Sequence, residues 1–421
     1  MRTRFPMWTL IILVALGAAS YYGYQYIKER PPHFLISLVI NTDPPPPLPQ
    51  GDLAPLTAPS GFTATVFSRE TPGARVLARD PKGALVVSLT KEGRVVALPD
   101  LDADGKADRV VVILSGLREP HGLYFHCPDT GFASADQDAC KLYVVETGAV
   151  RSYAYDTDTY TISNPQMIAT LPAGSGHSTR TLLPHPDGKR LLVSIGSSCN
   201  VCDEENGMRA TVQEIDLSTN KTTTFASGLR NTVFMAIDPV IGEVWGTDNG
   251  RDLIGDDIPP DEVNIIEQGK NYGWPICYGA NIHDTDFDSS RSLPAGRQAC
   301  ADMVPPHIEL QAHSAALGIA FIPEEGWPED MGNDILIAYH GSWNRSEPTG
   351  YKVIRFNLNQ RSRDAIGGPI DFLTGFLPEG SNDTDDAIGR PVGILAEPGG
   401  IIYISDDRAG AIYRITRDSL E

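Results

Sequence analysis

Short runs of β-branched and aromatic residues, separated by turns rich in glycine, proline and aspartate, dominate the chain from about residue 60 onward. Scarcely any segment has the longer period of an amphipathic helix, so the pattern predicts strands. Six times, one apolar run is followed by a turn and a second run. These paired runs occupy residues 83–98, 140–155, 189–198 with 212–217, 242–252 with 261–266, 333–344 with 351–356, and 400–415.

Many of these pairs follow a short run that contains a glycine, at residues 122–125, 317–321 and 391–395. Repeated strand units of this kind are typical of the blades of a β-propeller. The units average about 60 residues, more than the roughly 40–45 of compact propeller repeats, so we expect inserted loops at one mouth of the central channel. We therefore predict an all-β fold in which residues 58–421 form a six-bladed β-propeller of four-stranded antiparallel blades.

The N-terminal part of the chain has a different pattern. Arg2 and Arg4 precede the apolar run at residues 7–19, and basic residues in that position keep the N-terminus cytoplasmic. No clean A-x-A site ends the run. We therefore expect residues 1–28 to be an uncleaved transmembrane anchor, with a removed signal peptide as the alternative. Residues 29–57, which contain four consecutive prolines, are predicted to be a linker. The propeller is then expected in the periplasm, anchored to the inner membrane, or secreted if the anchor is cleaved.

Composition narrows the class of partner and the compartment. The net charge of −20 argues against a nucleic-acid partner, because phosphate binding needs a basic surface. The six cysteines fall into three local pairs, and local pairing in an oxidising compartment is the simplest arrangement. The C-x-x-C pair is followed by aspartate rather than histidine, and no second C-x-x-C could complete a zinc site. We predict the disulfides Cys127–Cys140, Cys199–Cys202 and Cys277–Cys300.

An aspartate-rich turn lies between the first two units. Asp100, Asp102, Asp104 and Asp108, with a glycine at the sixth position, match the opening of a calcium loop. The twelfth position is Val111 instead of the bidentate glutamate of such loops. Two interpretations stay open, a second, structural calcium site and an Asp-rich turn.

The densest group of polar residues that packing alone does not explain lies at residues 229–279. Arg230 and Asn231 begin one predicted strand, and the next strand leads into a glycine-containing turn, residues 248–252. Such a turn can direct backbone carbonyls at a hard cation such as calcium. A solvated acidic loop is the alternative.

His177 lies in a glycine-flanked turn directly before a predicted strand. A histidine presented in this way can be a general base, because its pKa lies near working pH; a structural histidine is the alternative. His177 begins the third unit and Arg230 begins the fourth. We expect both side chains near the same mouth of the propeller.

At this point several motifs, in order, resemble those of soluble pyrroloquinoline-quinone-dependent sugar dehydrogenases. They are Gly-His177, Leu-Arg230-Asn231, D-P-x-x-G-E-V-W, the turn at 248–252 followed by P-D-E-V-N, and N-Y-G-W-P. The later motifs A-H-S-A-A-L-G-I-A-F, H-G-S-W-N-R and G-R-P-V-G-I-L look most like the sorbosone dehydrogenase branch and related pyranose dehydrogenases. The resemblance covers residues 60–418.

The resemblance implies a six-bladed propeller with the quinone in its mouth. His177 would take the proton of the sugar's anomeric hydroxyl while hydride passes to the quinone. Arg230 and Asn231 would contact the cofactor's oxygens. The backbone carbonyls of Gly250 and Arg251 would bind the Ca²⁺ that orients the quinone.

The C-terminal motifs imply further cofactor contacts. Arg390 would pair with a cofactor carboxylate. The glucose dehydrogenase relatives have a second arginine where this chain has Val392, and their cofactor-binding lysine has no clear match. His340, Trp343 and Arg345 are the candidates to replace it. His121 and His313 also begin blade-start segments, and for each a structural role fits as well as a place in the mouth.

The main hypothesis is a membrane-tethered quinoprotein dehydrogenase that oxidises an aldose or a sorbosone-like sugar. No C-x-x-C-H haem motif occurs, so its electrons are expected to pass to an external acceptor. One alternative is a calcium-dependent hydrolase of the lactonase type, which would need side-chain carboxylate and amide ligands converging on the metal. Another is a non-catalytic propeller that binds proteins or glycans.

Overall fold

The computed structural model describes residues 56–127, 140–288 and 300–418. The predicted anchor, residues 1–28, and all but the last two residues of the predicted linker lie outside these ranges. Within the described ranges, no helix is long and apolar enough to span a membrane.

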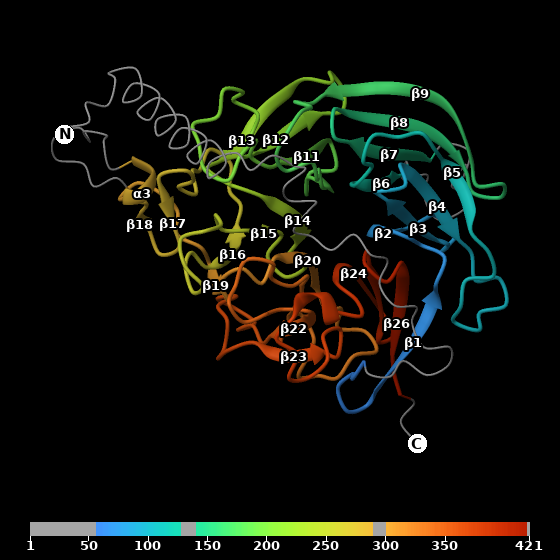
Figure 1. Cartoon of the computed structure of the whole chain (residues 1–421). Coiled ribbons are helices and arrows are strands. Elements are labelled where there is room, and N and C mark those ends of the chain that lie inside the picture. Colours follow the sequence, from blue (N-terminus) through green and yellow to red (C-terminus); the bar gives the residue numbers. More distant parts are fainter. Residues whose placement is uncertain (1–55, 128–139, 289–299, 419–421) are drawn as a thin grey trace, which may run out of the picture.

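Six four-stranded antiparallel sheets are arranged around a common centre (Figure 1). The first three blades, from the innermost strand outward, are β2 (Ala74–Arg79), β3 (Leu85–Leu89), β4 (Arg94–Leu98) and β5 (Val111–Leu114); β6 (Leu123–His126), β7 (Lys141–Glu146), β8 (Ala149–Asp156) and β9 (Thr161–Thr170); and β10 (Leu182–Pro184), β11 (Arg190–Ile195), β12 (Thr211–Asp216) and β13 (Thr222–Ser227).

The last three blades are β14 (Thr232–Ile237), β15 (Val244–Asp248), β16 (Asp261–Ile265) and β19 (Ile308–Leu310); β20 (Ala316–Phe321), β21 (Ile335–Tyr339), β22 (Lys352–Phe356) and β23 (Ile370–Leu373); and β24 (Pro391–Glu397), β25 (Ile401–Asp406), β26 (Ala411–Arg417) and β1 (Phe62–Ser68). The fourth blade carries an insertion with the hairpin β17 (Cys277–Tyr278) and β18 (Ile282–His283) and the short helix α3 (Thr285–Asp288). A 3-10 turn, η3 (Thr384–Asp386), precedes β24.

The predicted all-β, six-bladed architecture is confirmed. Each predicted pair of runs forms the two middle strands of one blade, from β3 and β4 in the first to β25 and β26 in the last. The glycine-containing runs before the pairs coincide with the innermost strands β6, β20 and β24. The three predicted disulfides are formed as well: Cys127–Cys140, Cys199–Cys202 and Cys277–Cys300.

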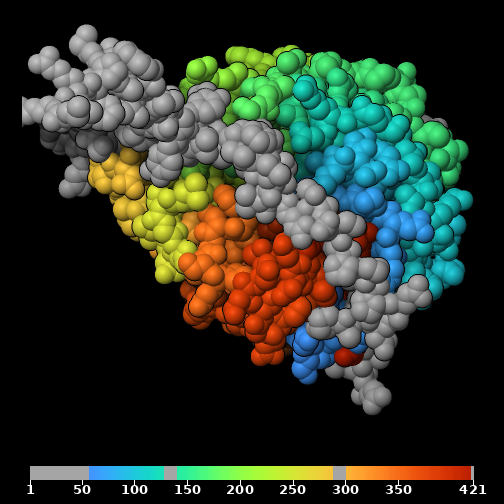
Figure 2. Space-filling model, in the orientation of Figure 1, coloured from blue at the N-terminus to red at the C-terminus, as the bar shows by residue number. Residues whose placement is uncertain are grey.

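The sixth blade combines the two ends of the described chain. Strand β1 pairs antiparallel with β26, with Phe62 opposite Arg417 and Val66 opposite Tyr413. In Figure 2 the blue N-terminal residues accordingly lie beside red C-terminal ones. This pairing closes the ring, and the pattern of paired runs did not predict it.

Glycines allow the innermost strands of neighbouring blades to approach closely. A Cβ at Gly393 would lie 2.2 Å from the carbonyl oxygen of Arg75, and one at Gly318 would lie 2.3 Å from that of Val392. Backbone contacts this short exclude every side chain. They explain the glycine in the recurrent runs. Val392 is fully buried in the apolar core between blades. An arginine at this position, as in the glucose dehydrogenase relatives, would be a buried charge without a partner.

Candidate active site

A polar cavity of about 210 Å³ opens where several innermost strands begin. It is lined by His177, Arg230, Asn231, Asn249, Gly250, Asp252, Asp261, His313, Ala315, Trp343 and Asn344. A larger hollow of about 480 Å³ lies between β1 and residues 106–110 and contains none of these residues. The convergence of polar groups, rather than size, therefore marks the candidate site.

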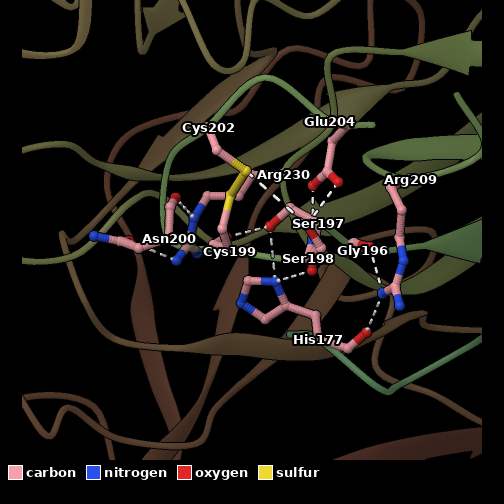
Figure 3. The surroundings of a disulfide bond; sticks show 10 residues. All are labelled: His177, Gly196, Ser197, Ser198, Cys199, Asn200, Cys202, Glu204, Arg209 and Arg230. Carbon is pink, nitrogen blue, oxygen red and sulfur yellow. Dashed lines mark hydrogen bonds between the residues drawn. A yellow bond between two sulfur atoms is a disulfide. The ribbon is translucent and has the colours of Figure 1, made fainter. Parts of the chain in front are cut away.

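His177 is presented to this cavity by Ser197, the second residue after β11. Its Nδ1 lies 2.9 Å from the hydroxyl and 3.2 Å from the carbonyl oxygen of Ser197 (Figure 3). The hydroxyl donates its own proton to the carbonyl of Cys199 at 2.6 Å, so it accepts from Nδ1–H. The hydrogen therefore resides on Nδ1, and the lone pair of Nε2 is available for a ligand.

Three arginines lie close to His177. Arg180 and Arg209 donate to its backbone carbonyl at 2.7 and 3.2 Å. Burial holds the pKa of His177 well below its usual value, and the nearby Arg230 lowers it further. The imidazole is therefore neutral at physiological pH, which is the form that accepts a proton.

The guanidinium of Arg230 makes four hydrogen bonds. Its Nε donates to the backbone carbonyl of Asn200 at 2.9 Å, and Nη2 donates to the side chains of Asn200 and Asp252 at 2.9 and 3.0 Å. Its Nη1 donates to the carbonyl of Asn249 at 3.1 Å. Because a guanidinium has five N–H groups, one on Nη1 is left for a ligand in the cavity.

Asn231 offers the cavity a buried acceptor. Its Nδ2 donates to Asn249 at 3.3 Å, whereas its Oδ1 is buried and has no hydrogen-bond partner among the described residues. The Oδ1 of Asn344 is in the same situation. Buried polar atoms normally have partners, so these two oxygens indicate a ligand with donor or cationic groups. Gly196 permits this arrangement, because a Cβ there would lie 2.7 Å from both Asn231 Oδ1 and His177 Cβ.

The turn after β15 forms one wall of the cavity. The N–H of Gly250 donates to Asp261 at 3.0 Å, and a Cβ on Gly250 would lie 2.7 Å from the carbonyl of Pro260. The side chain of Arg251 points to Asp284 in a buried ion pair of 2.6 Å. Only the backbone of Arg251 is therefore available to a cation at this turn.

Two buried carboxyl groups, Asp248 and Asp261, and the partly buried Glu262 lie around the same turn. Burial raises the pKa of Asp248 to about 7, that of Asp261 to about 6 and that of Glu262 to about 8. A nearby cation would strongly stabilise the ionised form of these carboxyl groups, because it compensates the negative charge that burial disfavours.

The C-terminal candidates divide into two groups. Trp343 lines the cavity with 46% of its surface exposed. Arg345 instead bonds the carbonyls of Asp256 and Ala312 and pairs with Asp257 at 3.2 Å. It therefore joins two loops of the mouth.

His340 and Arg390 belong to a network outside the 210 Å³ cavity. His340 Nε2 lies 2.9 Å from Asp407, which also pairs with Arg75 at 2.7 Å. Arg390 donates to the carbonyls of His340, at 3.1 Å, and Gly341. The sequence did not single out Arg75 or Asp407. They lie on blades one and six, and they join the network around His340 of blade five only in the folded propeller.

The remaining candidates have different surroundings. His313 lines the cavity and its Nε2 lies 2.8 Å from the carbonyl of Gly255, so it supports the loop after the turn. His121 is fully buried and lies 3.3 Å from Thr181. In the Asp-rich turn, carboxylate oxygens of Asp100, Asp102 and Asp108 lie within 4.8 Å of one another, and Asp104 is not in that group.

Comparisons with known proteins agree with this geometry. The family model described as TrAA12-like matches residues 56–418. An uncharacterized protein from Borreliella burgdorferi is 31% identical over 366 residues, which cover 86% of this chain and 90% of that relative. A pyrroloquinoline quinone-dependent sugar dehydrogenase from Hypocrea jecorina is 25% identical, with 66% and 71% covered. A pyrroloquinoline quinone-dependent pyranose dehydrogenase from Coprinopsis cinerea is also 25% identical, and the chain spans about half, 52%, of its length.

Solved structures share the fold. A calcium structure of a Trichoderma reesei carbohydrate-active enzyme of family AA12 superposes with a TM-score of 0.72 at 24% identity, covering 86% of this chain and 97% of that one. The holo form of the pyranose dehydrogenase quinone domain from Coprinopsis cinerea gives a TM-score of 0.70 at 22% identity, with 88% and 98% covered. The family match over most of the chain, together with the Borreliella relative, shows that this chain belongs to the TrAA12-like family.

Proposed function

We propose that this protein is a dehydrogenase that uses pyrroloquinoline quinone and calcium to oxidise an aldose or a sorbosone-like sugar. The observation that carries the proposal is the convergence of a neutral histidine with a free Nε2, an ordered guanidinium and a buried unpartnered amide oxygen in one cavity. The names of the Hypocrea and Coprinopsis relatives support the same class of reaction.

The residues present fit a planar, anionic, polar cofactor. Arg230 supplies positive charge and one free N–H, and the oxygens of Asn231 and Asn344 are unpartnered acceptors. The half-exposed ring of Trp343 offers an apolar face. For a calcium ion, the backbone carbonyls of Gly250 and Arg251 would be the ligands, with buried carboxyl groups nearby. Arg390, His340 and Arg345 would act at a greater distance from the cavity, by shaping the loops around it.

When bound, the quinone would supply a two-electron acceptor and calcium would supply a Lewis acid. His177 would accept the proton of the sugar hydroxyl at Nε2, while Ser197 holds the ring through Nδ1. Arg230 would stabilise negative charge that develops on oxygen in the cavity. Because Arg230 is buried, this interaction is stronger than it would be in bulk water.

The two alternatives have less support. A lactonase-type metal site needs several side-chain ligands on one ion. Within the described ranges, the groups of three or more His, Cys, Asp or Glu side chains close enough to share one ion are Asp100 with Asp102 and Asp108, and Glu204 with the disulfide-bonded Cys199 and Cys202. Neither group lines the cavity. A purely binding propeller would not need the neutral histidine and the buried guanidinium together.

The deciding experiment is a titration of calcium-loaded protein with pyrroloquinoline quinone, followed by dye reduction with aldoses and sorbosone. Saturable binding with sugar-dependent reduction is the expected result. A folded, calcium-loaded protein that binds no quinone would remove the proposal and favour the hydrolase or the binding scaffold.

The cellular setting extends the proposal. We propose that residues 1–28 tether the enzyme to the inner membrane through the linker at 29–57, and that the propeller works in the periplasm. The three disulfides fit an oxidising compartment. Electrons would pass to an external acceptor. The proposal includes a second, structural calcium ion bound by Asp100, Asp102 and Asp108, with Asp104 nearby.

A further inference from the structure

The Cys199–Cys202 disulfide closes a short loop directly beside His177 and Arg230 (Figure 3). The loop follows β11 through Gly196, Ser197 and Ser198. Cys199 and Val201 are buried, at 6% and 8% exposure. On its outer side, Glu204 accepts from the N–H and the hydroxyl of Ser198 at 2.6 and 2.8 Å. The loop is therefore fixed by a covalent bond and by a carboxylate.

Asn200 lies between the two cysteines and makes four hydrogen bonds to the active-site wall. Its backbone carbonyl and its Oδ1 accept from Nε and Nη2 of Arg230, both at 2.9 Å. The same Oδ1 accepts from the N–H of Asp252 at 2.8 Å, and Nδ2 donates to the carbonyl of Asp252 at 3.0 Å. One asparagine therefore fixes the guanidinium and the end of the Gly250 turn relative to each other.

These contacts depend on both the backbone and the side chain of Asn200. The residue is not in a strand, so no sheet ladder orients it. The disulfide restricts the loop, and restricted groups lose less entropy when they bind a partner. Arg230 also donates to Asn249 and pairs with Asp252, so without the Asn200 side chain the guanidinium would lose one of its four contacts, and the Gly250 turn would lose both of its contacts with Asn200.

We propose that Asn200, presented by the Cys199–Cys202 disulfide, is a positioning residue that holds Arg230 and the Gly250 turn in the arrangement that binds the quinone. The inference rests on the proposed function, and it adds to that function a residue and a disulfide that act through Arg230 and the turn. Asn200 does not line the cavity, so its effect is exerted through these groups and not on the proton transfer itself.

The test compares quinone binding by Asn200→Ala and by Asn206→Ala in the calcium-loaded protein. Asn206 is an exposed residue of the same segment, and among the described residues its side chain accepts only from the N–H of Met208, at 3.0 Å. We expect Asn200→Ala to raise the Kd for the quinone by at least about tenfold, because a charged donor loses its acceptor. Asn206→Ala should bind as the wild type does. At saturating quinone, the KM for sugar should be unchanged in both variants, whereas kcat should fall in Asn200→Ala alone, because Arg230 also stabilises the charge that develops in the cavity.

The disulfide is tested by Cys199→Ser with Cys202→Ser, and the control is Cys127→Ser with Cys140→Ser on the second blade. The first pair should raise the quinone Kd as Asn200→Ala does, and the second should not. If the first pair does not fold, as judged by circular dichroism, the Asn200 comparison decides. Equal quinone Kd values for wild type and Asn200→Ala overturn the inference and leave the proposed function intact. A wild type that binds no quinone removes both.

Discussion

Among the described residues, Ser197 alone bonds the imidazole of His177, through its hydroxyl at 2.9 Å and its carbonyl at 3.2 Å. Since that hydroxyl donates to Cys199, the contact has one direction, with Nδ1 as the donor. Ser197 therefore determines which nitrogen of His177 can act as a base. It does so with neutral groups, so the histidine is oriented without a carboxylate that would raise its pKa.

Replacing His177 by alanine should remove the base and leave the cofactor contacts of Arg230 in place. We expect kcat to fall by about 10²–10⁴, with the quinone Kd within about threefold of wild type. Added imidazole should restore part of the turnover, because the cavity left by the ring borders Ser197. Unchanged turnover in His177→Ala would falsify the assignment of His177 as the base.

Gly250→Ala should weaken calcium binding. The added Cβ would lie 2.7 Å from the carbonyl of Pro260, so the turn must shift. The expected result is a calcium affinity lower by about tenfold or more in calorimetry, with a parallel loss of quinone binding. Gly207→Ala is the matched control, because no atom of the described residues lies within 4 Å of a Cβ at Gly207. Calcium binding by Gly250→Ala equal to that of wild type would place the metal elsewhere.

The calcium-free protein should lose stability as the pH rises from about 7 to 8.5. Burial raises the pKa of Glu262 to about 8 and that of Asp406 to about 7. An acid whose pKa rises on folding contributes stability below its unfolded pKa, near 4, and loses it as pH rises through the folded value. His177 and His340 have lowered pKa values, so their contribution to the free energy of unfolding increases with pH only up to about pH 7. Above that pH, each carboxyl group lowers the free energy of unfolding by at most about 1.4 kcal/mol per pH unit.

Glu262→Gln tests this pH dependence, because glutamine cannot ionise. Its amide oxygen can still accept from Nδ2 of Asn264, which donates to Glu262 at 3.0 Å. The thermal midpoint of this variant should fall less steeply between pH 7 and 8.5. Glu267→Gln, at an exposed position, should follow the wild-type slope. Parallel slopes for wild type and Glu262→Gln would show that Glu262 is already ionised in the folded protein.

The contact between innermost strands predicts a large effect at Gly393. A Cβ there would lie 2.2 Å from the carbonyl of Arg75 on the neighbouring blade, and neither backbone can move without separating the blades. Gly393→Ala should lower the free energy of unfolding by about 2 kcal/mol or more, measured by denaturant unfolding, whereas Gly207→Ala should change it little. An alanine variant as stable as the wild type would mean that the strands can separate at low cost.

Most of the fold was predicted from local sequence patterns. The two middle strands of each blade, such as β3 with β4 and β25 with β26, are apolar runs close together in the sequence, so each pair can be recognised from the sequence. The pairing of β1 with β26 is not visible, because its partners lie some 355 positions apart. A single run of apolar residues does not specify its partner.

The same distinction applies to the site. His177, Arg230 and Asn231 could be proposed because each begins a strand at the same end of a repeated unit. Asn200 and Ser197 could not, because each acts through another residue; the C-x-x-C motif that contains Asn200 predicted only a disulfide. Trp343 lines the cavity, whereas Arg345 donates hydrogen bonds to the neighbouring loops. The two residues lie two positions apart in one motif, and the sequence does not show which of them reaches the cavity.

The pairing of β1 with β26 also sets the order of events during synthesis. Of the described strands, β1 is synthesised first and its partner β26 last, so the sixth blade stays open until almost all of the propeller is available. A nascent propeller therefore carries an unpaired edge on β1 throughout translation, which is a surface open to pairing with other chains. A circularly permuted chain that begins in the loop between β1 and β2 would carry β1 directly after β26. It should complete its sixth blade as a local hairpin and fold faster than the natural order.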